Sequence, residues 1–229
     1  MMLIARTVAV ALFASTAFGF AAGAPTPAFS PAIPPMIVNV TATPDASASL
    51  VAHLLAEANA IWHPSGVTFV WQHAARVVVP YARASETGPY VPRTLRLTIG
   101  DNRGPERDGR LPLGWIQFDD AAAPEQEIYL SHRNALQMML ESRDAVGDAA
   151  QMPMAQREML LARAMGRALA HELGHYLLAS KVHTEQGLMK AILSAAELFS
   201  PDSGRLRIEP AQRRTIAARL HREPLVASS

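Results

Sequence analysis

Apolar residues recur with two periods along the chain, and these periods separate strands from helices. Alternation of β-branched and polar residues is typical of a strand, whereas apolar residues three and four positions apart line one face of a helix. Alternating or short apolar runs predict strands at 36–42, 67–72, 94–99, 113–118 and 127–131. The helical period predicts helices at 45–62, 133–146, 155–180 and 209–222.

Residues that start or stop helices agree with these boundaries. Asp45 or Ser47 can cap the first helix, and Pro64 together with Gly66 ends it. A polar, glycine-rich segment at 100–112 is expected to form a loop. No internal repeat is visible, and the order of the elements predicts a single α/β domain from residue 36 onward.

Charge and cysteine content narrow the possible functions. The 229 residues include 21 Lys and Arg against 20 Asp and Glu, so the net charge is +1. This balance provides no broad basic face, and we expect no nucleic-acid partner. The chain has no cysteine, which excludes disulfides, thiolate zinc sites, iron–sulfur clusters and a cysteine nucleophile.

The first 24 residues have the layout of a secretory signal peptide. Arg6 precedes an uncharged stretch at 7–22, and small residues with Ala-x-Ala spacing follow at 22–24. The apolar stretch is shorter than the roughly 20 residues that a membrane-spanning helix needs. We therefore expect a signal peptide at 1–24, a proline-rich leader at 25–35 and a secreted or periplasmic protein without a stable membrane anchor.

The longest predicted helix carries the motif H-E-x-x-H, formed by His171, Glu172 and His175. Residues four apart on a helix differ by about 40° in direction and one turn in height, so both imidazoles can point toward one ion. Glu172 is turned about 100° from His171 and lies beside that ion. This pattern predicts a Zn²⁺ site in which the metal acidifies a water and Glu172 takes the proton.

A catalytic zinc ion needs a third protein ligand, and three residues downstream of the motif are candidates. His183 lies eight residues after His175, beyond the expected helix end at 179–181, where a returning loop could bring it to the ion. Glu197 lies 22 residues after His175 in a short apolar segment and is the main alternative. Glu185 is expected to be a solvated loop residue. The short return to the helix favours His183.

These residues resemble the metzincin clan of zinc endopeptidases, whose pattern is H-E-x-x-H-x-x-G-x-x-H followed by a methionine-containing turn. The resemblance covers the motif, His183 and the segment Gly187-Leu188-Met189. It differs in the eight-residue spacing and in Leu178, which stands where the clan has glycine, so a wider loop around 180–182 must make the bend.

The resemblance implies a metzincin-like zincin: a mixed twisted sheet, an active-site helix and a small C-terminal subdomain, within a catalytic domain at 36–229. It implies that His171, His175 and His183 bind zinc, that Glu172 is the general base and that Met189 forms a hydrophobic floor. In the fold that it resembles, an edge strand binds extended substrate; 113–118 or 127–131 could serve in this way, or both could be purely structural strands.

The expected function is that of a secreted zinc endopeptidase that acts as a monomer on peptide or protein substrates. Two alternatives stay open: a zinc-stabilised binding module without hydrolytic activity, and a zinc hydrolase of non-peptide amides. Outside the motif, Arg163 and Arg167 are spaced four apart and are expected on the outer face of the long helix. His132 is expected to be a surface residue, and Tyr176 to pack beside the helix.

Overall fold

The computed structural model describes residues 33, 35–73, 95–106, 111–120 and 123–222, all within one compact unit that begins at residue 32. The predicted signal peptide at 1–24 and most of the leader at 25–35 lie outside the described residues and stay predictions. Within the described ranges, no helix combines the length and the apolar character needed to cross a membrane.

In the part of the chain that the structure describes, five strands form one mixed sheet, as the resemblance implies. They are β1 (Met36–Ala42), β2 (Phe69–His73), β3 (Leu95–Gly100), β4 (Gly114–Phe118) and β5 (Pro124–Ser131). Their order across the sheet is β2-β1-β3-β5-β4. The first four in this order run parallel, and β4 pairs antiparallel with β5, placing Trp115 opposite Tyr129. Strand β4 therefore forms one edge of the sheet.

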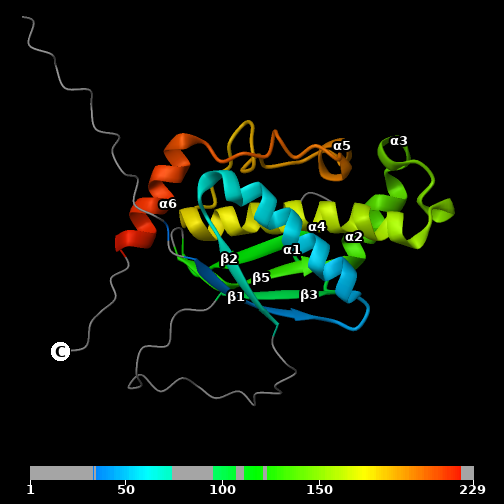
Figure 1. Cartoon of the computed structure of the whole chain (residues 1–229), viewed down its shortest axis with the longest axis horizontal. Coiled ribbons are helices and arrows are strands. Elements are labelled where there is room, and N and C mark those ends of the chain that lie inside the picture. Colours follow the sequence, from blue (N-terminus) through cyan, green and yellow to red (C-terminus); the bar gives the residue numbers. More distant parts are fainter. Residues whose placement is uncertain (1–32, 34, 74–94, 107–110, 121–122, 223–229) are drawn as a thin grey trace, which may run out of the picture. The chain divides into compact units, whose positions relative to one another are not determined.

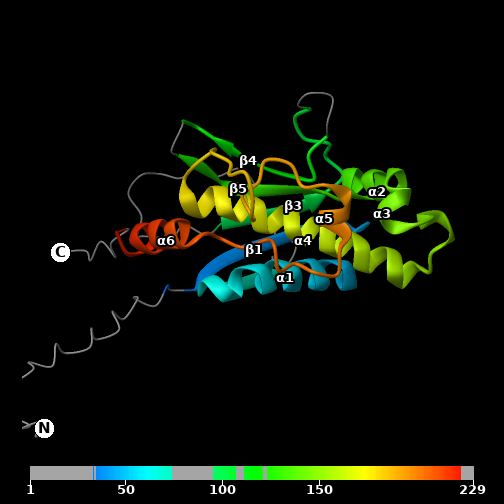
Figure 2. The same ribbon diagram turned by 90° about the horizontal axis from the view of Figure 1, so that it is seen from above.

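Six α-helices accompany the sheet in the described part of the chain. They are α1 (Ala48–Trp62), α2 (His132–Glu141), α3 (Arg143–Val146), α4 (Met154–Leu178), α5 (Ala195–Phe199) and α6 (Pro210–Arg222). Figures 1 and 2 show α1 and α4 running side by side, with α6 near the end of α4 that leads into the C-terminal part. In the described residues after α4, the helices are α5, with five residues, and α6, with thirteen.

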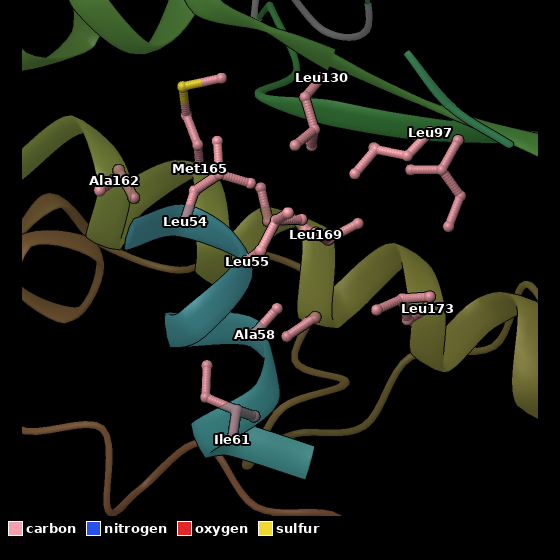
Figure 3. Close-up of a cluster of buried hydrophobic side chains, with 14 of the residues drawn as sticks. Leu54, Leu55, Ala58, Ile61, Leu97, Leu130, Ala162, Met165, Leu169 and Leu173 are labelled. Atoms are coloured by element: carbon pink, nitrogen blue, oxygen red, sulfur yellow. The ribbon is translucent and has the colours of Figure 1, made fainter. Parts of the chain in front are cut away.

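The hydrophobic core lies between α1, α4 and the sheet. Side chains from all three meet in Figure 3, where Leu54 and Ala58 of α1 face Leu169 of α4, with Leu97 and Leu130 contributed by the strands. All five are at most 1 % exposed. Burial of a leucine-sized side chain contributes about 1.5–3 kcal/mol, so this cluster fixes α4 firmly against the sheet.

Local signals account for most helix boundaries. Ser47 caps α1 by accepting a hydrogen bond from the Leu50 N–H at 3.0 Å, and Gly66 follows in the left-handed region at φ 74°. The expected single helix at 133–146 is instead two, because the chain breaks at Ser142, whose hydroxyl donates to the Met138 carbonyl at 2.6 Å. A side chain that bonds the preceding turn competes with the helical pattern.

The prediction that Arg167 lies on the outer face of the long helix is wrong. Arg167 has no exposed surface. Its Nε donates to Oε1 of Glu57 on α1 at 2.8 Å, and Nη2 donates to the Ser200 carbonyl at 2.8 Å. Nη1 donates to the Glu197 carbonyl. The guanidinium is buried because α1 and the α5 region supply acceptors for it, which the spacing of two arginines on one helix does not reveal.

Candidate metal centre

The structure brings three histidines together. His171 and His175 come from α4, and His183 comes from the loop that follows it. One nitrogen of each ring lies within 4.8 Å of the other two. Among the described residues this is the one group of three His, Cys, Asp or Glu side chains close enough to share an ion. Its burial is graded, since His175 is buried, His171 is half-buried and His183 is exposed.

Backbone carbonyls orient the two helical imidazoles. Nδ1 of His171 lies 2.8 Å from the Leu188 oxygen, and Nδ1 of His175 lies 2.7 Å from the Ser180 oxygen. A carbonyl oxygen can only accept, so each Nδ1 carries the proton and each Nε2 presents a lone pair. The two Nε2 atoms face each other at 3.0 Å. A cation shared by these nitrogens removes the repulsion between their lone pairs.

Burial keeps the imidazole of His171 neutral. The pKa of His171 falls from 6.5 to about 4, first because burial removes the charged ring from water and then because His175 lies close. The hydrogen bond to Leu188 opposes this shift, and His183 adds to it. Metal binding requires the neutral form of histidine, so the site provides that form at physiological pH.

The return of the chain toward the histidines begins at a left-handed residue. Ala179 has φ 48° and ends α4, with its N–H bonded to the carbonyls of His175 and Tyr176. Ser180 then donates its N–H to the His175 carbonyl at 3.2 Å, and the Val182 N–H bonds the Ser180 hydroxyl at 3.1 Å. The expected bend at 180–182 is therefore present, although alanine takes the position where glycine is usual.

Met189 packs against the turn of α4 that contains Gly174 and the two motif histidines. It is 1 % exposed, and a Cβ added at Gly174 would be only 2.2 Å from its sulfur. Gly174, between the two histidines of the motif, thus lets the methionine approach the helix backbone. Sequence reasoning missed this role, although a glycine inside a helix is a signal of close packing. Met189 is therefore buried against the helix, and its role as the floor of a metal site stays a prediction.

Glu172 faces the edge strand. Its side chain is largely buried, and a Cβ added at Gly114 of β4 would lie 3.2 Å from Glu172 Cγ. Phe118, at the end of β4, meets the His175 ring edge-on at 6.5 Å between centroids. Of the two strands considered for substrate, β4 lies at the edge and β5 lies inside the sheet. The histidines, Glu172 and the outer edge of β4, which pairs with no further strand of the described residues, therefore lie in one region.

Glu197, the alternative third ligand, has other partners. Its carboxylate oxygens lie 2.9 and 3.0 Å from Nζ of Lys190. It also forms a capping box with Ser194 at the start of α5. Bonds from the Ser194 N–H and from Lys190 lower the pKa of Glu197 to about 2. The carboxylate is thus committed to α5 and Lys190, and the histidine group does not include it.

The remaining residues considered from the sequence have simpler surroundings. Glu185 is exposed in the loop, as expected. Tyr176 packs beside the helix, under the guanidinium of Arg219 at 5.6 Å from the ring centre. His132 lies at the start of α2, with Nδ1 3.8 Å from the Asp101 carboxylate and its side chain only 16 % exposed. It is thus more buried than expected.

Comparison with known proteins gives little beyond the site itself. No family model matches the chain, and no curated protein matches it. Among solved structures, the chain is similar to archaemetzincin from Methanopyrus kandleri, at 15 % identity and a TM-score of 0.46, over 86 % of this chain and 99 % of that one. At this level of similarity the neighbour assigns neither an activity nor a residue role to the chain.

Proposed function

We propose that the chain is a zinc-dependent endopeptidase, in which His171, His175 and His183 hold Zn²⁺ and Glu172 is the general base. The observation that carries this proposal is the convergence of three imidazole nitrogens within 4.8 Å of one another. The H-E-x-x-H spacing on a buried helix supports it, because that spacing places two ligands and one carboxylate at the same turn.

The donor set fits zinc. Zinc–nitrogen distances of about 2.0–2.1 Å in a tetrahedral site separate two ligand nitrogens by about 3.3 Å, and the Nε2 atoms of His171 and His175 are 3.0 Å apart. Both rings have the carbonyl partners on Nδ1 that zinc-binding histidines usually have. Zinc held by three imidazoles supplies Lewis-acid chemistry: it polarises a carbonyl group and lowers the pKa of water to about 7.

The chain's own residues would bind the substrate and move the proton. Strand β4 would bind an extended peptide through the backbone groups on its outer edge, which would place a scissile bond near Glu172. Glu172 would accept a proton from the attacking water and deliver it to the leaving amine nitrogen. The carbonyls of Leu188 and Ser180 would keep the imidazoles in their binding tautomer.

The decisive experiment compares metal content and proteolysis in the full chain. The wild-type protein should contain one zinc per chain and cleave a general protein substrate, and a chelator should abolish cleavage. Glu172→Gln should keep its zinc and lose at least 100-fold in kcat, since general base catalysis contributes about 10²–10⁴-fold. Glu185→Gln, which changes an exposed carboxylate in the loop that carries His183, is the matched control and should remain active.

The same assay separates the alternatives. Zinc binding without cleavage of any peptide would favour a binding module, and cleavage of cell-wall amides in place of peptides would favour a non-peptide hydrolase. A wild-type protein without stoichiometric zinc, or a zinc-loaded Glu172→Gln protein with full activity, would refute the proposal.

We also propose export of the protein, which rests on the composition of residues 1–24. The supporting features are a positive start, an uncharged apolar stretch and small residues before Pro25. N-terminal sequencing of the protein recovered outside the cytoplasm tests this proposal. A mature chain that begins near residue 25 is expected, and a chain that keeps Met1 and stays in the cytoplasm would contradict it.

A further inference from the structure

The orientation of His171 depends on a loop that is distant in sequence. The Leu188 carbonyl, which accepts the His171 Nδ1 proton, lies 17 residues further along the chain. Backbone bonds shape this loop, from the Thr184 N–H to the Met189 carbonyl at 2.8 Å and from the Leu188 N–H to the Arg207 carbonyl at 3.1 Å. Whatever holds the loop in place therefore also holds the imidazole.

Lys190, the next residue after Met189, fastens the end of this loop to α5. Its Nζ lies 2.9 and 3.0 Å from the two carboxylate oxygens of Glu197. The Glu197 side chain is itself fixed, because the N–H and the hydroxyl of Ser194 both donate to Oε2 at 2.8 Å. The ion pair thus joins the end of the loop to the first turn of α5.

Arg167 ties α5 back to the helix of the metal centre. It lies on α4 one turn before His171, and it donates to the carbonyls of Glu197, in the middle of α5, and of Ser200, directly after α5. Helix α5 has only five residues, and isolated helices of this length are not stable in water. Its position therefore depends on such contacts.

These contacts link two residues of α4 through the loop and α5. His171 contacts Leu188 in the loop, Lys190 at the end of the loop contacts Glu197 on α5, and the Glu197 carbonyl accepts from Arg167 on α4. We propose that Lys190 and Glu197 are positioning residues: their ion pair ties the loop that carries the Leu188 carbonyl to α5, which Arg167 anchors, and so fixes His171 in its metal-binding orientation. This inference rests on the proposed function, since it assigns the pair a role in holding a metal ligand. Glu197, an alternative third ligand in the sequence, would thus support the centre from outside it.

The pair should matter more for metal binding than for folding. Lys190 and Glu197 are about one-third exposed, and ion pairs at such positions contribute little to stability. Loss of a hydrogen-bond partner of a ligating histidine typically weakens metal binding 10–100-fold. Because Lys190 and Glu197 act one contact further away, we expect an effect near the lower end, about tenfold.

The test uses Lys190→Met and Glu197→Gln in the full chain. Glutamine can still cap α5, so Glu197→Gln removes the charge while it keeps the capping group. Both variants should bind Zn²⁺ about tenfold more weakly in competition with a chromophoric chelator, with little change in the melting temperature of the metal-free protein. Lys190→Arg, which keeps the charge, should recover most of the affinity. Glu127→Gln breaks the Arg96–Glu127 pair on the sheet and should leave zinc affinity unchanged.

A second measurement does not depend on zinc. In the metal-free protein, the Nδ1 proton of His171 should be protected from solvent exchange by the Leu188 carbonyl, and Lys190→Met should reduce that protection while Glu127→Gln does not. Unchanged protection, or unchanged zinc affinity in both variants, would overturn the inference. If the wild-type chain binds no zinc, the proposed function fails, and this exchange measurement still decides whether the pair positions His171.

Discussion

A methyl group at Gly174 is predicted to disturb the helix between the two motif histidines. The added Cβ would lie 2.2 Å from the Met189 sulfur, 3.1 Å from Met189 Cε and 3.6 Å from Trp62 Cζ2. Carbon atoms in good contact are about 3.5–4.0 Å apart, so Met189 must move. Both Met189 and Trp62 are buried, at 1 % and 0 % exposure, which leaves little room for that movement.

The net effect is a balance of two terms. Glycine to alanine inside a helix normally stabilises by about 1 kcal/mol. Overpacking a core typically costs about 1–3 kcal/mol, and the short distance to the sulfur places this site at the upper end. Gly174→Ala should therefore destabilise by about 2 kcal/mol, which lowers the melting temperature by about 4–8 °C in a domain of this size.

Denaturant unfolding of the single and double variants checks this reasoning. Met189→Ala removes the sulfur, so Gly174→Ala should destabilise the Met189→Ala protein less than it destabilises the wild type. The coupling energy between the two substitutions should be about 0.5–3 kcal/mol. Gly166→Ala is the matched control, because its Cβ would meet the Leu54 carbonyl and Glu57 Cβ at 2.7 Å. It should also destabilise, but Met189→Ala should not relieve it. A Gly174→Ala protein that is more stable than wild type, or that shows no coupling to Met189, would refute the argument.

Three further predictions concern the buried Arg167, the stability of the protein at acid pH and the binding of zinc. Arg167→Met should destabilise by about 3–5 kcal/mol in urea unfolding, because it leaves the Glu57 carboxylate and two carbonyls without their donor; a loss below about 1 kcal/mol would contradict the bonding described. His171 has a folded pKa of about 4 against an ordinary 6.5, so the unfolded chain binds more protons between these values. The contribution of His171 to the free energy of unfolding of the metal-free protein should be fully present above pH 6.5 and should be lost as the pH falls toward 4. In thermal unfolding, His171→Gln should flatten this part of the pH profile. A variant whose stability falls as steeply with pH as that of the wild type would contradict this role of His171. Zinc at a free concentration of 100 times its dissociation constant should raise stability by about 2.7 kcal/mol, reversed by a chelator; an unchanged melting temperature would count against a specific site.

Local patterns in the sequence predict the elements well. Strand 36–42 has the same bounds as β1, and the long helix expected at 155–180 agrees with Met154–Leu178. These agreements arise because periodicity and capping act over a few neighbouring residues. The break of the helix at Ser142 is a local effect that periodicity alone overlooked.

Features that depend on distant contacts could not be predicted in the same way. The antiparallel pairing of β4 follows from its neighbour in the folded sheet. The burial of Arg167 requires acceptors from α1 and the α5 region, 30 to 110 residues away. Helical spacing alone places His171 and His175 together, so the sequence could predict this pair. Whether His183 or Glu197 joins the pair depends on the course of the loop after α4, which no local pattern predicts.

The three imidazoles differ in how each is supported. His171 and His175 belong to the helix that also carries the core leucines, whereas His183 stands on an exposed loop beyond the left-handed Ala179. The first two cannot be shifted without repacking the interior, but the third can be exchanged while the interior stays intact. Under the proposed function, metal preference would therefore be altered by redesign of the exposed residues 181–183, provided that Ser180 keeps its hydrogen bonds to His175.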